Sequence, residues 1–197
     1  MYKQVEIWHK VGAPSELTAV LSYDEKPGIQ ALENTAPDLP PVPGQHAAVG
    51  GDHEYIRHGT RSLLAGIDLW NGEVLGFVRD RHRSAEFIGL RLAEAHYPAE
   101  ARIRMVLDNQ SAHISRETRT FLATVPNRFE FIFTPTHGSW LNLIESFFAK
   151  MAKILLRGIR VTSKAELKTR IEMYLRDVNE EPVVFRWKYK LETLLVV

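Results

Sequence analysis

Residues 103–108 read Ile-Arg-Met-Val-Leu-Asp, a short apolar run that ends in an aspartate, and residues 19–24 read Ala-Val-Leu-Ser-Tyr-Asp, a second run of the same kind. Runs of this length and composition are typical of buried strands. After Asp24 the chain continues as Glu-Lys-Pro-Gly, and Pro and Gly are expected to stop the first strand there. In α/β sheets the functional crevice lies outside the carboxyl ends of the strands, so Asp24 and Asp108 are expected to meet at that edge.

The segments around these two runs predict a mixed α/β protein. Asn71-Gly72 separates two apolar runs, and this dipeptide is the strongest short signal for a hairpin with a type I′ turn. The Pro- and Gly-rich residues 36–51 are expected to form an extended surface loop. Periodicity predicts helices at about 84–96, 115–123, 141–156 and 164–178, and a strand at 129–133. This order of elements indicates a ribonuclease-H-like fold, with a mixed central sheet flanked by helices.

Composition limits the class of protein. The 197 residues are 45% hydrophobic and 25% charged, as expected of one globular domain with an ordinary core. No stretch approaches the roughly 20 apolar residues that cross a bilayer, and the start has no secretion-signal pattern, so we expect a cytoplasmic protein without a membrane partner. The absence of cysteine excludes disulfides and thiolate metal sites. Any metal would therefore bind oxygen ligands or histidine.

A third acid, Glu145, lies beside the apolar stripe of the helix predicted at 141–156. Together with Asp24 and Asp108 it would supply the hard oxygen ligands that Mg²⁺ or Mn²⁺ prefers. Two such ions about 4 Å apart could activate a water or a 3′ hydroxyl for attack on a phosphodiester. Structural roles are the alternative, because a strand-ending aspartate is often a turn former and Glu145, three residues after Asn142, could complete a helix cap. The residues alone leave both alternatives open.

Cationic and histidine side chains predict contacts to nucleic acid. The net charge is only +1, but residues 1–53 carry three lysines against seven acids, whereas residues 148–190 carry eleven Lys and Arg against five acids. Phosphate contacts supply most of the sequence-independent affinity for DNA. A solvated helix face or a hydrogen-bonded loop histidine is the alternative for each candidate. The candidates are an arginine cluster after the hairpin (Arg79, Arg81 and Arg83), two loop histidines (His113 and His137), and one side of the 141–156 helix at i, i+3 and i+7 (Lys150, Lys153 and Arg157).

Three blocks of the sequence resemble the catalytic blocks of bacterial IS630-type transposases, which are relatives of the Tc1/mariner group. They are Tyr-Asp-Glu-Lys at 23–26, Val-Leu-Asp-Asn at 106–109 with His113 following, and Thr-Pro-Thr-His-Gly-Ser-Trp-Leu-Asn-Leu-Ile-Glu at 134–145. The blocks occur in the family's order, and the interval between Asp108 and Glu145 is close to that of the group. The resemblance implies a DDE catalytic domain in which Asp24, Asp108 and Glu145 bind Mg²⁺ or Mn²⁺, as two ions in one site.

The resemblance also implies an activity and partners. The family cuts DNA at the ends of a mobile element and joins the freed 3′ ends to a target, typically at a TA dinucleotide, working as a homodimer on paired ends. Family members carry a longer helix-turn-helix region before the first block. We therefore expect residues 1–18 to be a remnant of an interdomain linker, residues 19–180 to be the catalytic domain and residues 181–197 to be a C-terminal tail.

Two other functions remain open on the sequence alone. The chain could be a catalytically incomplete remnant that binds DNA or dimerises with a full-length transposase. It could instead be a structure-specific nuclease of the same fold, such as a junction resolvase, although the block from Trp140 to Glu145 argues against this.

Overall fold

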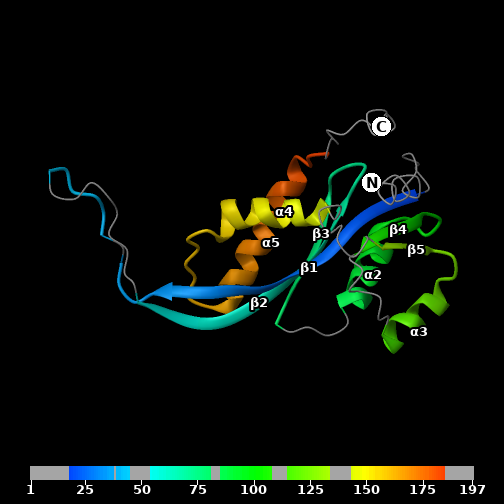
Figure 1. Cartoon of the computed structure of the whole chain (residues 1–197), viewed down its shortest axis with the longest axis horizontal. Helices are drawn as coiled ribbons and strands as arrows, with labels where there is room; N and C mark the ends of the chain where they lie inside the picture. Colours follow the sequence, from blue (N-terminus) through cyan, green and yellow to red (C-terminus); the bar gives the residue numbers. More distant parts are fainter. Residues whose placement is uncertain are drawn as a thin grey trace, which may run out of the picture.

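The computed structural model describes residues 18–37, 39–44, 54–80, 85–107, 115–133 and 143–184. These residues form one five-stranded sheet, with helices on both of its faces (Figure 1). The strands are β1 (Thr18–Asn34), β2 (Tyr55–Asp68), β3 (Val74–Arg79), β4 (Arg102–Leu107) and β5 (Phe129–Phe133). The helices are α2 (Ala85–His96), α3 (Arg116–Thr124), α4 (Leu143–Met151), its π-helical continuation η3 (Ala152–Leu156), and α5 (Lys164–Glu180).

The sheet is mixed, with strand order β3-β2-β1-β4-β5. The first three strands form an antiparallel meander, and β4 and β5 continue the sheet in parallel with β1. Strand β1 is therefore the central strand on which the antiparallel and parallel halves meet. The predicted order of elements and the mixed α/β class are confirmed.

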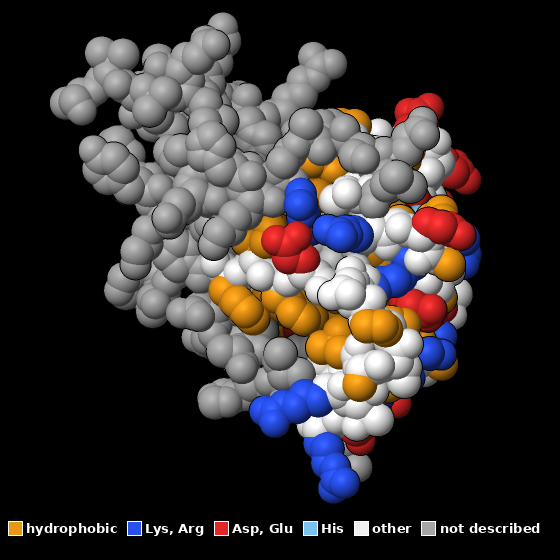
Figure 2. Space-filling model, turned by 90° about the vertical axis from the view of Figure 1, so that its right-hand side faces the viewer, with side chains coloured by type: hydrophobic (Ala, Val, Ile, Leu, Met, Phe, Trp, Pro, Cys, Tyr) orange, Lys and Arg blue, Asp and Glu red, His pale blue; other side chains and the backbone are white. Residues whose placement is uncertain are grey.

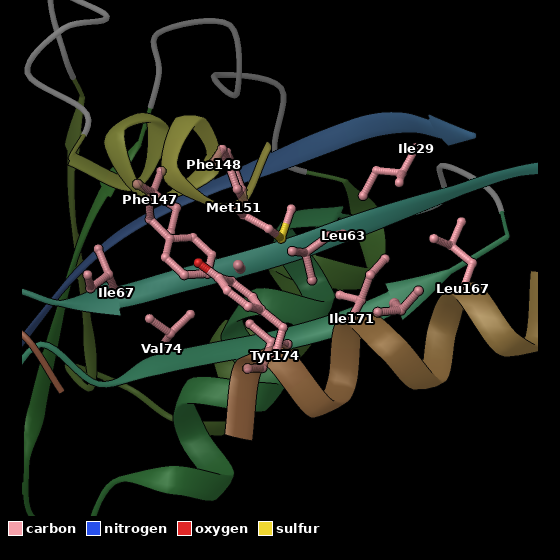
Figure 3. Close-up of a cluster of buried hydrophobic side chains, with 14 of the residues drawn as sticks. Ile29, Leu63, Ile67, Val74, Phe147, Phe148, Met151, Leu167, Ile171 and Tyr174 are labelled. Carbon is pink, nitrogen blue, oxygen red and sulfur yellow. The ribbon is translucent and has the colours of Figure 1, made fainter. Parts of the chain in front are cut away.

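Each face of the sheet carries its own hydrophobic core. Helices α4 and α5 cover one face, where Phe147, Met151 and Ile171 pack with Leu63 of β2 (Figure 3). Helices α2 and α3 cover the other face, in a cluster that includes Leu90, Phe121, Leu21 and Tyr23. Successive side chains of a strand point to opposite faces. Even-numbered residues at the start of β1 therefore point toward α4, and odd-numbered ones point toward α2.

Strand β1 is longer than predicted, and it runs through Asp24 and beyond Pro27-Gly28. The pairing with β2 shifts register between Lys26 and Ile29, which is a β-bulge. Proline has no N–H for the ladder, and Gly28 adopts a φ of +67° that few other residues tolerate. The bulge accommodates both residues without ending the strand. The predicted end of the strand at this point was wrong for that reason.

The hairpin between β2 and β3 is confirmed, but its turn is not type I′. A type I′ turn needs positive φ at both central residues, and of the Asn-Gly pair only Gly72 has one, at +80°. The turn is instead organised by Asp68, whose carboxylate is 4% exposed and accepts the N–H of Trp70 at 2.7 Å and the hydroxyl of Tyr97 at 2.6 Å. A long-range contact to the end of α2 therefore sets the local turn.

The remaining predicted elements are confirmed to within two residues. Ser115 and Ser163 cap α3 and α5, each accepting an N–H of the first turn at 3.1 Å. The helix predicted at 141–156 is α-helical to Met151 and π-helical from there to Leu156. The described residues of the predicted 36–51 loop are exposed. Within the described ranges, no helix is both long enough and apolar enough to span a membrane.

Candidate metal centre between strand β1 and helix α4

Asp24 lies inside β1, at the point where the pairing of this strand with β4 ends. The last parallel pair joins Ser22 to Val106, whereas Asp24 is still paired with β2. Because successive side chains of a strand alternate between its faces, Asp24 lies on the same face as Ser22 and Val20. The Val20 side chain belongs to the core beneath α4. The half-buried Asp24 carboxylate accepts the N–H of Glu25 at 2.7 Å. Because Asp24 belongs to a paired strand, the turn-former alternative does not apply to it.

Glu145 lies in the first turn of α4, directly after a residue that is anchored to β1. That residue, Ile144, is fully buried, and its backbone N–H donates to the Ser22 hydroxyl oxygen at 3.1 Å. Ser22 is itself 1% exposed. Asp24 follows Ser22 by two residues and Glu145 follows Ile144 by one. The structure therefore brings the backbones of Asp24 and Glu145 to the same end of the contact between β1 and α4.

The orientation of α4 keeps Glu145 at the border of the core. The predicted apolar stripe is confirmed, since Ile144, Phe147, Phe148 and Met151 are all buried. Figure 3 shows Phe147, Phe148 and Met151 facing the sheet. Glu145 lies between these positions and is exposed. An acidic side chain in the first turn of a helix also interacts favourably with the positive end of the helix dipole. The carboxylate is therefore accessible to solvent and to ligands while its backbone is fixed.

Asp108, the second predicted carboxylate, lies outside the described residues. Strand β4 ends at Leu107, the residue before it. The Val106 side chain belongs to the core beneath α4 and the Leu107 side chain to the core beneath α2. Strands β1 and β4 thus run in parallel register up to the pair Ser22–Val106, and in the sequence each member of this pair is followed two residues later by an aspartate.

The donor set at this junction suits a hard divalent cation. Mg²⁺ and Mn²⁺ prefer carboxylate oxygens, and Asp24 and Glu145 supply them from two elements that a direct hydrogen bond joins. In the part of the chain that the structure describes, no group of three or more His, Cys, Asp or Glu side chains could hold a metal ion. The chemistry of the two described carboxylates is that of ligands for such an ion, and further oxygen ligands would be needed to complete its coordination.

The cations predicted to bind nucleic acid are only partly described. Arg79 is half-buried at the end of the edge strand β3, and Lys150, Lys153 and Arg157 are exposed. The expectation that these last three share one side of an α-helix was wrong, because the helix becomes π-helical at Ala152 and Arg157 is its C-cap residue with extended backbone. On the face in Figure 2, Lys and Arg lie among Asp, Glu and apolar side chains. Outside the described residues lie Arg81, Arg83, His113 and His137.

Ser22 is the residue at this junction that the sequence analysis did not single out. Its signal was present, since it is the one serine, a small polar side chain, in the largely apolar run Ala19–Tyr23. A buried hydroxyl needs a hydrogen-bond partner, so its position in a core strand indicates a contact to another element. The identity of that element follows only from the three-dimensional structure.

Comparison with known proteins finds relatives among transposable-element proteins. The uncharacterized 39 kDa protein of insertion element IS630 from Shigella sonnei is 28% identical over 121 residues, which are 61% of this chain and 35% of that protein. The Mos1 strand transfer complex superposes with a TM-score of 0.59 at 18% identity, covering 91% of this chain and 53% of that chain. The Mos1 transposase paired-end complex with left transposon end gives a TM-score of 0.58 at 19% identity, with 88% and 52% covered.

These likenesses confirm the ribonuclease-H-like fold and the resemblance to IS630-type proteins. The chain spans about a third of the curated relative and about half of each Mos1 chain. The family described as DDE superfamily endonuclease matches residues 28–168, a range that includes Asp108 and Glu145 and begins just after Asp24. Since this match covers more than half of the sequence, the chain belongs to the DDE superfamily endonucleases.

Proposed function

We propose that this chain is the catalytic domain of a transposase, which cleaves DNA strands at the ends of a mobile element and transfers the freed 3′ ends to a target at a TA dinucleotide. The observation that carries the proposal is the hydrogen bond from Ile144 to Ser22, which joins the two elements that bear Asp24 and Glu145. Membership of an endonuclease family and similarity to an insertion-element protein support it. We assign residues 19–180 to this domain, residues 1–18 to a linker and residues 181–197 to a tail.

In this proposal Asp24, Asp108 and Glu145 hold two Mg²⁺ or Mn²⁺ ions. In the sequence, Asp108 follows Val106 by two residues, just as Asp24 follows Ser22, and Ser22–Val106 is the last pair between β1 and β4. Bound divalent ions make a water or a 3′ hydroxyl a better nucleophile and neutralise charge during attack on a phosphodiester. The carboxylates would balance the charge of the ions, and the backbones of β1 and α4 would hold Asp24 and Glu145 in place.

Contacts to DNA are assigned to the cations and histidines predicted from the sequence. Lys150 lies in α4 and Lys153 in η3, and Arg157 follows as the C-cap residue, so a DNA backbone that entered the site and ran along these elements would pass near them. Arg79, on the edge strand, would act with Arg81 and Arg83. In the sequence, His113 follows the second catalytic block and His137 lies within the third. We expect the active form to be a homodimer that holds two element ends.

The test is metal-dependent cleavage by the purified chain. Supercoiled plasmid DNA is incubated with the protein and Mn²⁺, and nicked and joined products are quantified. Glu145→Gln and Asp108→Asn should each lower the rate about a hundredfold or more, because losing a metal ligand removes several kcal/mol of transition-state stabilisation. Glu180→Gln, which changes an exposed carboxylate at the end of α5, is the matched control and should leave the rate unchanged.

Two outcomes would contradict the proposal. Unaltered cleavage by Asp108→Asn would remove this residue from the metal site. DNA binding by the wild-type chain without any Mn²⁺-dependent cleavage would favour the alternative of a remnant that binds DNA or dimerises with a full-length transposase. Calorimetric titration of Mn²⁺ into the wild type and Glu145→Gln separates loss of metal binding from loss of DNA binding.

A further inference from the structure

The Ser22 hydroxyl makes a contact that joins the two described halves of the candidate site. Ser22 lies on the central strand with 1% of its surface exposed, and its oxygen accepts the N–H of Ile144, a residue 122 positions away in the sequence. The residue before Ser22 and the residue after it point to the opposite face of the sheet, into the core with α2. Ser22 is thus a polar side chain directed at the start of α4 from an otherwise apolar part of β1.

This contact acts as a helix cap supplied by another element. The first four N–H groups of an α-helix have no partner within the helix, and Ile144 is the second residue of α4. Its side chain is fully buried, so the site offers water little access to this N–H. The Ser22 oxygen therefore satisfies a donor that folding would otherwise leave buried and unpaired. The start of α4 has a defined position on β1 because of this bond.

Strand β1 is itself held firmly at this point. On its other face, the Tyr23 ring lies against Gly89 of α2, where a β-carbon would come within 2.5 Å of the ring. Tyr23 is 5% exposed. With α2 packed closely on one side, β1 provides a rigid reference for the helix bound on the other side. A shift of α4 must therefore break or stretch the bond to Ser22.

We propose that Ser22 is a positioning residue that sets the placement of Glu145 relative to Asp24, an inference that rests on the proposed function. The two carboxylates stand one and two residues beyond the two ends of this hydrogen bond. Metal ligands must be held within fractions of an ångström, and groups that orient them typically contribute 10–100-fold to metal affinity or activity. In this role Ser22 would act through the backbone of Ile144.

The experiment compares three variants of Ser22 with one control variant of Ser163. Ser22→Thr keeps the hydroxyl and adds a methyl group. Ser22→Val has the shape of the threonine variant but lacks the hydroxyl. Ser22→Ala removes the hydroxyl without adding a methyl group. Ser163→Ala deletes a serine cap of the same kind on α5, whose oxygen also accepts a helix N–H at 3.1 Å. Each variant is measured for its Mn²⁺ dissociation constant by calorimetry, for nicking rate, and for stability by urea unfolding.

The inference predicts a specific pattern of Mn²⁺ affinity. Ser22→Ala and Ser22→Val should bind Mn²⁺ about 10–100-fold more weakly, Ser22→Thr should stay within a few fold of the wild type, and Ser163→Ala should lose stability with unchanged affinity. Unchanged Mn²⁺ affinity in Ser22→Ala would overturn it, as would equal affinities of the Thr and Val variants. If Ser22→Ala does not fold, the Mn²⁺ affinities of Ser22→Thr and Ser22→Val test the inference instead.

A parallel measurement separates this inference from the function on which it rests. If Glu145→Gln weakens Mn²⁺ binding and Ser22→Ala does not, the positioning role of Ser22 fails while the metal site stands. If Glu145→Gln binds Mn²⁺ as the wild type does, the assigned metal site itself fails, and the role of Ser22 fails with it.

Discussion

Replacing Tyr97 with phenylalanine should destabilise the protein measurably, because it removes a hydrogen bond to a buried charge. The Tyr97 hydroxyl donates to the Asp68 carboxylate at 2.6 Å, and Asp68 is 4% exposed. A hydrogen bond to a charged group contributes about 1.5–3 kcal/mol to stability. For a chain of this size, each kcal/mol corresponds to about 2–4 °C in Tm. We expect Tyr97→Phe to lower Tm by about 3–12 °C.

The same contact predicts that the stability of the folded protein depends on pH in the alkaline range. Burial, followed by the charge of Asp68 and the hydrogen bond to it, raises the pKa of Tyr97 well above its ordinary value of 10.0. The folded state therefore binds this proton more tightly than the unfolded state does. The associated stability is fully present below pH 10 and is lost as the pH rises above it. Tyr97→Phe should remove this part of the alkaline decline.

The assay is urea unfolding followed by circular dichroism between pH 7 and 11. Tyr55→Phe is the matched control, because the Tyr55 hydroxyl oxygen also takes part in a hydrogen bond, which it accepts from Arg57 at 2.7 Å, but at an exposed position. The control should change stability by less than about 0.5 kcal/mol. The reasoning is refuted if Tyr97→Phe is as stable as the control, or if it declines above pH 10 as steeply as the wild type.

Three further changes test the packing and the helix termini. Gly89→Ala places a β-carbon 2.5 Å from the Tyr23 ring, so urea unfolding should show a loss of about 1–3 kcal/mol, and a gain would contradict the close contact. Hydrogen bonds, first that from the Thr162 N–H, lower the pKa of Glu166 to about 2. The ionised carboxylate therefore stabilises the folded state above pH 4.5, and this contribution is lost as the pH falls toward 2. In Glu166→Gln the free energy of unfolding should depend less on pH over this range. Arg128 donates to four backbone carbonyls that follow α2, so Arg128→Met should cost about 1.5–3 kcal/mol in the same assay, and stability equal to the wild type would show these bonds to be weak.

Much of the fold was predictable because its signals are local. The two apolar runs that end in aspartate are neighbouring parallel strands, and helix periodicity located α2 to α5. The errors arose where distant contacts override local preference. Pro27-Gly28 became a bulge because β2 pairs on both sides of it. The conformation of the Asn-Gly turn depends on Asp68, whose carboxylate accepts a hydrogen bond from Tyr97, 29 residues away.

The candidate site was predictable from its motif but not from its contacts. The strand alternation of β1 and the stripe of α4 indicate which side of each element Asp24 and Glu145 occupy. That these elements meet through Ser22 and Ile144 depends on a pairing across 122 residues, for which the sequence contains no local signal. Asp108 lies outside the described residues, so its place in the site is still a prediction.

The long sequence separation of the Ser22–Ile144 bond has a consequence for the order of folding. Closing contacts between distant residues costs chain entropy that local hairpins avoid, so the β1–β2–β3 meander is expected to form before β4 and α4 dock on β1. The candidate site would then be among the last parts of the domain to assemble. A nascent chain could not cut DNA until α4 had been synthesised and had folded onto a finished sheet. In the proposed positioning role of Ser22, this bond would make cleavage depend on completed folding.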